Sequence, residues 1–115
     1  MLLDQYPQAI ATLQRQQLKQ EQQVRRFKAI LVTLDRELDA AIAYDLELKN
    51  DTQRKARRAE LQALEDYQGA LLDLQNAQDR LIELEIDLTL LRSQFSVLKL
   101  EKRGAIAQLE AAIAV

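Results

Sequence analysis

Apolar side chains recur at alternating steps of three and four residues along the second half of the chain. This spacing is typical of a helix that buries one face against another helix. It predicts a helix over residues 66–113, with Gly104 inside it. We call the series the C-terminal seam, and it comprises Tyr67, Ala70, Leu74, Ala77, Leu81, Leu84, Leu88, Leu91, Phe95 and Leu98.

The same rhythm runs through the first half of the chain and predicts a helix over about residues 7–44. Pro7 suits the first turn, where its missing N–H needs no partner. Two successive seam positions are Gln17 and Gln20, which either weaken the seam and fix its register or face solvent beyond the packed region. This N-terminal seam comprises Ile10, Leu13, Gln17, Gln20, Val24, Phe27, Leu31, Leu34, Leu38 and Ala41.

The rhythm stops after Tyr44, and residues 45–65 read as a turn followed by a short helix. Asn50 with Gln53 three residues later, or Asp51 by itself, supplies the chemistry of a helix N-cap. Beyond this helix the sequence leaves two alternatives open. Either Asp66 caps a new helix, or one helix continues through Glu65 and Asp66.

The two seams have equal length, so a chain that turns back between them lays one against the other. Only two Gly and one Pro occur among the 115 residues, which favours helix almost throughout. The predicted fold is therefore all-α. It is a single domain over residues 1–115, formed by a long antiparallel helical hairpin (a coiled coil) with a short connecting helix.

A second apolar stripe lies on a different face of the C-terminal helix. The short connecting helix spans only about 20 Å, whereas this stripe spans almost 30 Å at about 1.5 Å per residue. An uncovered apolar face of this length is typical of an interface. It predicts self-association, with a two-fold dimer as the first choice and an unknown protein partner as a further expectation. The outer stripe, as we call it, comprises Ile82, Ile86, Leu90, Val97 and Leu100.

Composition narrows the chemistry that the chain can perform. It has no Cys and no His, which excludes disulfides, zinc sites of the usual kind, thiolate nucleophiles and imidazole bases. We therefore expect no enzyme activity, no metal and no cofactor. The net charge of −2 favours neither nucleic acid nor membrane as a partner. Without a signal-peptide pattern or an apolar run of about 20 residues, we expect a soluble, cytoplasmic protein.

Basic residues gather near the connection, and two interpretations of them stay open. They either contact phosphates, with an affinity that falls steeply with salt, or pair with carboxylates of the acid-rich stretch that follows, from Glu60 to Asp87. The second interpretation is favoured, because aromatic side chains for stacking on bases are missing between them. This basic segment comprises Lys49, Arg54, Lys55, Arg57 and Arg58.

Around residues 49–56 and 64–68 the chain resembles small coiled-coil proteins of unknown function encoded in phage and mobile-element genomes. The resemblance is carried by the spacing of Asn50 and Arg54, by Tyr67 after an acidic break, and by the long heptad helix that follows. It covers roughly residues 44–100. It implies a helical protein encoded beside recombination or single-strand-binding genes, and it transfers no catalytic residue.

The sequence thus predicts a structural or adaptor coiled-coil protein that works through self-association and helix-mediated protein binding. The alternative is an accessory protein in a nucleic-acid process, such as phage-like recombination or single-strand handling. In that case the basic segment would contact phosphates.

Overall fold

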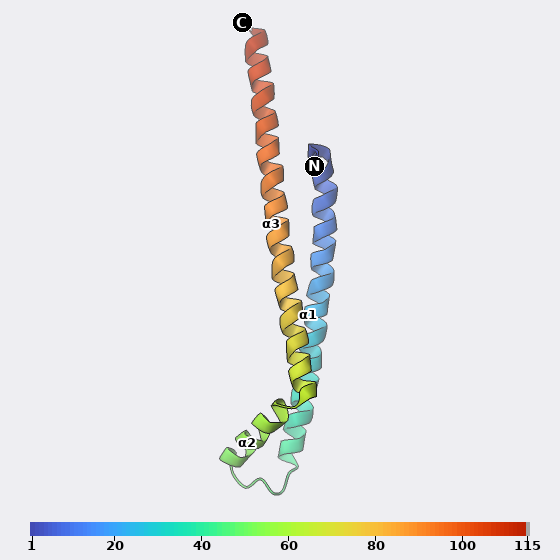
Figure 1. The fold of residues 1–115 in the computed structure, drawn as a ribbon, viewed down its shortest axis with the longest axis vertical. Helices are drawn as coiled ribbons and strands as arrows, with labels where there is room; N and C mark the ends of the chain where they lie inside the picture. Colours follow the sequence, from blue (N-terminus) through green and yellow to red (C-terminus); the bar gives the residue numbers. More distant parts are fainter. Residues whose placement is uncertain (115) are drawn as a thin grey trace. The chain divides into compact units, whose positions relative to one another are not determined.

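The structure of the chain is a computed structural model that describes residues 1–114. A short 3₁₀ turn, η1 (Leu3–Gln5), precedes three α-helices: α1 (Tyr6–Ala43), α2 (Asp51–Gln62) and α3 (Glu65–Ala114) (Figure 1). No strand occurs in this part of the chain. The all-α class and the helical hairpin with a short connecting helix are confirmed, and the helix bounds differ from the predicted ones by one or two residues.

Local chemistry at Asn50 explains where α2 begins. The backbone N–H of Gln53 donates to Asn50 Oδ1 at 2.9 Å, and Gln53 Oε1 in turn accepts from the backbone N–H of Lys49 at 2.6 Å. Asn50 is therefore the N-cap, and the alternative of Asp51 is wrong. Asp51 is the first helical residue, where its negative charge interacts favourably with the helix dipole.

The chain breaks between α2 and α3, two residues before the position that the sequence suggested. Asp66 is not an N-cap, because it lies with Glu65 in the first turn of α3. The side-chain amide of Gln68 donates to the carbonyl oxygen of Gln62 at 2.8 Å. This bond satisfies a carbonyl that the end of α2 would otherwise leave open, so the break needs no capping residue at Asp66.

The chain divides into two compact units, and the first combines residues 1–19 with the part of α3 from residue 81 onward. Here the start of α1 runs antiparallel to α3. The ring of Tyr6 stacks on that of Phe95, with the centroids 5.4 Å apart. Leu84 and Leu88 of the C-terminal seam are the most buried side chains of this unit, with exposed fractions of 3% and 4%.

The second unit, residues 20–80, contains the rest of α1, all of α2 and the start of α3. Its buried side chains are Val24, Leu31, Leu38, Ile42 and Ala77. The N-terminal seam therefore ends on Ile42, and the prediction of Ala41 is wrong. A final step of four residues from Leu38, instead of three, keeps the larger side chain inside, while Ala41 is exposed.

Gln20 lies inside the packed seam of this second unit. Its side-chain amide is partly buried and donates to the carbonyl oxygen of Ala77 at 3.0 Å. The interpretation that Gln20 faces solvent beyond the packed region is therefore wrong. Because the bond is directional, sliding α1 along α3 would break it, which fits a role in fixing the register.

The C-terminal seam is confirmed at every predicted position, since all ten of its residues are buried or half-buried.

None of the helices within residues 1–114 is both long enough and apolar enough to cross a membrane.

Candidate interaction surfaces

The outer stripe is exposed along its whole length. Its five side chains retain between 52% (Val97) and 64% (Leu100) of their accessible surface. No segment of the described chain buries them, so the short helix α2 is not a lid over the stripe.

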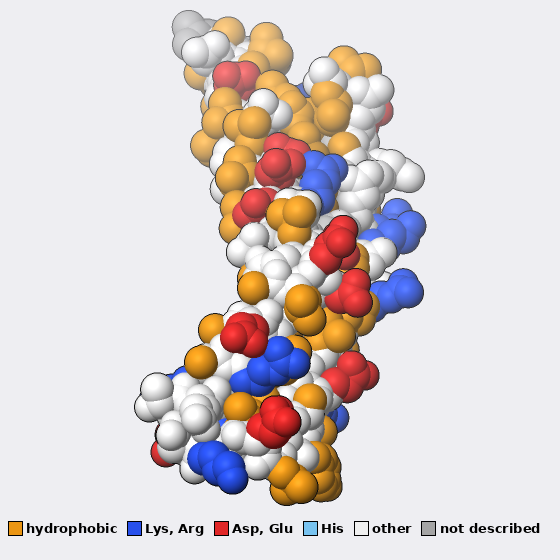
Figure 2. Space-filling model, turned by 60° about the horizontal axis from the view of Figure 1, so that its bottom comes forward, with side chains coloured by type: hydrophobic (Ala, Val, Ile, Leu, Met, Phe, Trp, Pro, Cys, Tyr) orange, Lys and Arg blue, Asp and Glu red, His pale blue; other side chains and the backbone are white. Residues whose placement is uncertain are grey.

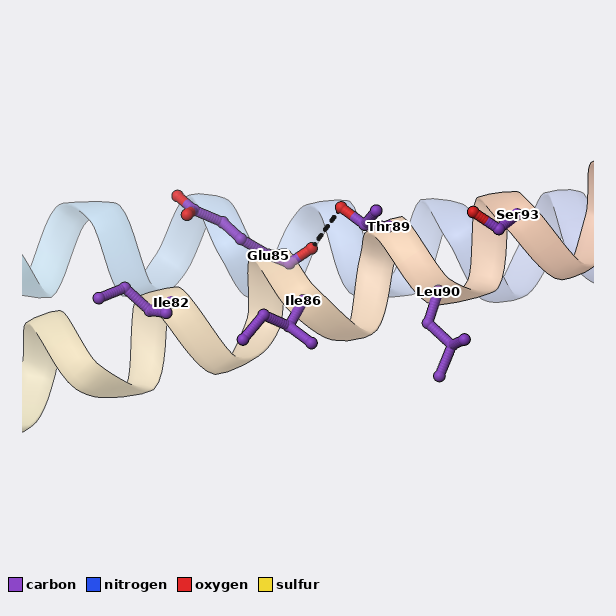
Figure 3. Close-up of a pocket in the computed structure, with 6 residues that line it drawn as sticks. All are labelled: Ile82, Glu85, Ile86, Thr89, Leu90 and Ser93. Atoms are coloured by element: carbon purple, nitrogen blue, oxygen red, sulfur yellow. Dashed lines mark hydrogen bonds between the residues drawn. The ribbon is translucent and has the colours of Figure 1, made fainter.

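Helix geometry explains why α1 leaves the outer stripe free. An α-helix turns by about 100° per residue, so Ile86 points about 200° away from both Leu84 and Leu88. Those two leucines are buried, whereas Ile86 is exposed. In Figure 3, Ile86 and Leu90 point away from the α1 ribbon. The stripe therefore occupies the face of α3 opposite to the seam.

A shallow hollow runs along this face of α3. Its surface is mostly apolar. The hydroxyl of Thr89 donates to the backbone carbonyl oxygen of Glu85 at 2.9 Å (Figure 3). Thr89 is thus already bonded and offers little to a polar ligand, so the hollow suits an apolar side chain. It is lined by Ile82, Glu85, Ile86, Thr89, Leu90 and Ser93.

The exposed apolar surface continues beyond the stripe that the sequence predicted. Ile106, Leu109 and Ile113 are exposed, and every described residue after Leu98 is exposed as well. Figure 2 shows hydrophobic side chains along the surface that leads to the grey C-terminal residue. The heptad signal there is carried by small residues, Gly104, Ala107, Ala111 and Ala114, which a search for large apolar side chains overlooks.

The basic segment is largely neutralised within the molecule. Arg54 pairs with Asp51 at 3.1 Å, and Arg57 pairs with Glu60 at 3.0 Å, both within α2. Figure 2 shows both blue and red side chains at the end that carries α2. Glu60, the partner of Arg57, is the first residue of the acid-rich stretch, whereas Asp51, the partner of Arg54, lies before that stretch.

The third arginine of the segment joins two helices. Arg58 Nη2 of α2 lies 2.5 Å from Asp39 Oδ1 of α1. Beside this ion pair, the hydroxyl of Tyr67 of α3 lies close to the side chains of Asp35 and Gln62. Side chains of α1, α2 and α3 thus form one polar cluster, which holds α2 in place. Arg58 therefore has a structural role.

Burial raises the pKa of Tyr67 above its ordinary value of 10.0, and the nearby carboxylate of Asp35 raises it further. The folded protein therefore favours the neutral phenol, and this contribution to stability is complete below about pH 10. As the pH rises through the folded-state pKa, the contribution is lost.

We expect the stability difference between the native chain and Tyr67→Phe to be constant below about pH 10 and to shrink above it. The native chain loses stability there through ionisation of Tyr67, whereas phenylalanine cannot ionise. Urea denaturation followed by circular dichroism at a series of pH values measures the difference. An unchanged difference up to pH 11 would contradict the role of Tyr67.

Lys49 and Lys55 form none of the three ion pairs described above, so they are the best remaining candidates for phosphate contact. Two isolated cations give a weak, salt-sensitive attraction. We therefore expect that adding the protein leaves the fluorescence anisotropy of labelled single- or double-stranded oligonucleotides unchanged at about 50 mM salt. Binding that disappears at about 200 mM salt and in Lys49→Gln/Lys55→Gln would instead support the nucleic-acid function. That variant leaves the Arg58–Asp39 pair intact.

Among residues 1–114, no group of three or more Asp or Glu side chains is placed to hold a metal ion. Comparison of the chain with protein-family models, with curated proteins and with solved structures finds no match. The resemblance to phage-encoded coiled-coil proteins therefore stays a prediction, and the geometry of the surfaces has to carry the functional argument.

Proposed function

We propose that the protein is a structural or adaptor protein of the cytoplasm that self-associates as a coiled coil through the outer stripe. The observation that carries this proposal is the exposed line of five large apolar side chains on the face of α3 opposite to the seam. Such a face is typical of an interface, and pairing it with the same face of a second copy is the self-complementary solution.

The energetics favour a reversible dimer. Full burial of a Val, Leu or Ile side chain contributes about 1.5–3 kcal/mol, and about half of that remains to be gained by a half-exposed side chain. The stripes of two copies together then contribute on the order of 10 kcal/mol. Association costs about 4–15 kcal/mol. Because the two terms are similar, we expect the dimer population to depend on protein concentration.

A second hollow supports the adaptor part of the proposal, the binding of another protein through a helix. It lies on α1 in the unit of residues 20–80, where the side chain of Ile30 is 41% exposed and Leu34 follows four residues later on the same face. Apolar side chains at helical spacing on an exposed face are the usual docking surface for a partner helix. The hollow is lined by Arg26, Ala29, Ile30, Thr33 and Leu34.

Light scattering of the native chain across the micromolar range tests the proposal. We expect the mass to approach that of two chains of 13.2 kDa as the concentration rises. A chain that stays monomeric at several tens of micromolar would contradict self-association, and the exposed stripe would then need a different protein partner.

A further inference from the structure

We propose that the second copy packs its α3 antiparallel on this α3, with Val97 of one copy level with Leu100 of the other. This inference rests on the proposed self-association and adds the direction and the register of the pair. It also enlarges the interface to include the small residues after Leu100.

The first argument comes from side-chain size along one uninterrupted heptad series. From residue 86 to residue 114, about 43 Å of helix, the series never leaves the steps of four and three. Its first part carries the large side chains, and its last part carries only glycine and alanine. The series, which we call the outer heptad, is Ile86, Leu90, Ser93, Val97, Leu100, Gly104, Ala107, Ala111 and Ala114.

A parallel pair would place large side chains against large ones at one end and would leave alanine against alanine at the other. An antiparallel pair instead sets the large side chains at the start of the series, Ile86 and Leu90, against small residues of the second copy, and only in the middle does one large side chain meet another, so the helices pack more evenly along the series. Gly104 fits this arrangement, because a Cβ built there meets nothing within 4 Å in the single chain. The space beside it is open for a side chain of the second copy.

Spacing restricts the register. In an antiparallel pair, the second copy presents the same series in reverse order. Every residue of one series then lies level with a residue of the other only in a few registers, because the steps of four and three have to coincide. One such register places Val97 level with Leu100 of the second copy, and it has three further kinds of layer. In these, residues of one copy lie level with residues of the other as follows: Ile86 with Ala111, Leu90 with Ala107, and Ser93 with Gly104.

Charge selects this register over the next one. Charged and polar residues border the outer heptad on each side. In an antiparallel pair, the residues that border one side face the residues that border the same side of the second copy. With Val97 level with Leu100, Glu101 meets Gln94 and Arg103 meets Ser96, so no like charges face each other.

The neighbouring register has Leu100 level with Gly104. There Glu101 meets its own counterpart in the second copy, and so does Arg103. Pairs of like charge at such distances are unfavourable. Of the two registers, the first therefore avoids a repulsion that the second contains twice.

The exposed end of α3 gives the last argument. Residues 99–114 are exposed on every face, yet they remain helical. A short helical segment without packing is only marginally stable in water. In the proposed pair, Ile86 and Leu90 of the second copy cover Ala111 and Ala107, which places this end against a packed neighbour.

Disulfide trapping tests the direction and the register, and the native chain has no Cys to interfere. Three single variants are needed: Leu90→Cys, Ala107→Cys and Ala114→Cys. After mild oxidation, we expect a mixture of Leu90→Cys and Ala107→Cys to yield a high fraction of cross-linked heterodimer. Leu90→Cys alone should yield little, because its two copies would lie about 25 Å apart.

The other outcomes overturn the inference in distinguishable ways. Efficient cross-linking of Leu90→Cys with itself would show a parallel pair. Preferential cross-linking of Leu90→Cys with Ala114→Cys would show the neighbouring register. Light scattering of each variant before oxidation separates these results from failure of the proposed function, because a dimer without the expected cross-link overturns only the geometry. A monomeric native chain overturns both.

Discussion

The triple variant Ile82→Lys/Ile86→Lys/Leu90→Lys should be monomeric at concentrations where the native chain is a dimer. Dimerisation would place six lysines in a desolvated interface, three at each end, and would remove the burial of six large apolar side chains. Each lost side chain costs about 1 kcal/mol of remaining burial, so the dissociation constant should rise by roughly a thousandfold or more.

The same variant should keep nearly all of its helix signal. All three positions are exposed and lie opposite to the seam, and lysine has a higher helix propensity than isoleucine. Light scattering measures the mass, and circular dichroism measures the helix content at the same concentration. Loss of the helix signal together with the mass would mean that the outer stripe stabilises the hairpin itself.

A matched control separates the surface from the added charge. Gln8→Lys/Thr12→Lys/Gln16→Lys adds the same charge, at the same spacing of four residues, to exposed positions of α1 in the same unit. This control should remain a dimer. If both triple variants became monomeric, charge alone would explain the effect. If neither did, the interface would lie elsewhere.

Leu88→Ala should have the largest effect on folding stability. The side chain of Leu88 is only 4% exposed, and truncation of a buried leucine costs about 2–5 kcal/mol, through lost transfer energy and the cavity that remains. That is a large share of the 5–15 kcal/mol typical of a whole domain. Urea denaturation followed by circular dichroism measures the loss.

Leu72→Ala is the control for this experiment, because the same substitution there removes a side chain that is 55% exposed. We expect a loss of about 1 kcal/mol or less. Both substitutions belong in the triple-lysine background, so that dimerisation does not add to the apparent stability. Equal losses for the two substitutions would contradict the assignment of Leu88 to the packed seam.

The amino-acid sequence by itself determined the helices, the two seams and the start of α2. A heptad spacing repeated over ten positions fixes which face of a helix is apolar, and only a helix can use that pattern. Asn50 caps α2 through a bond to the backbone three residues away, so the signal is local and readable from the sequence. The exposure of the outer stripe followed from the same periodicity, since one partner helix covers one face.

Only the tertiary structure decided features that depend on residues distant in the chain. The choice of Ile42 over Ala41 at the end of the seam is one example, because both fit the helical spacing. Asp39 becomes the partner of Arg58 because the chain turns between them, and no local pattern encodes this pair. Gln20 likewise finds the carbonyl oxygen of Ala77 only when α1 lies beside α3. Periodicity specifies faces, whereas such pairings depend on the register between the helices.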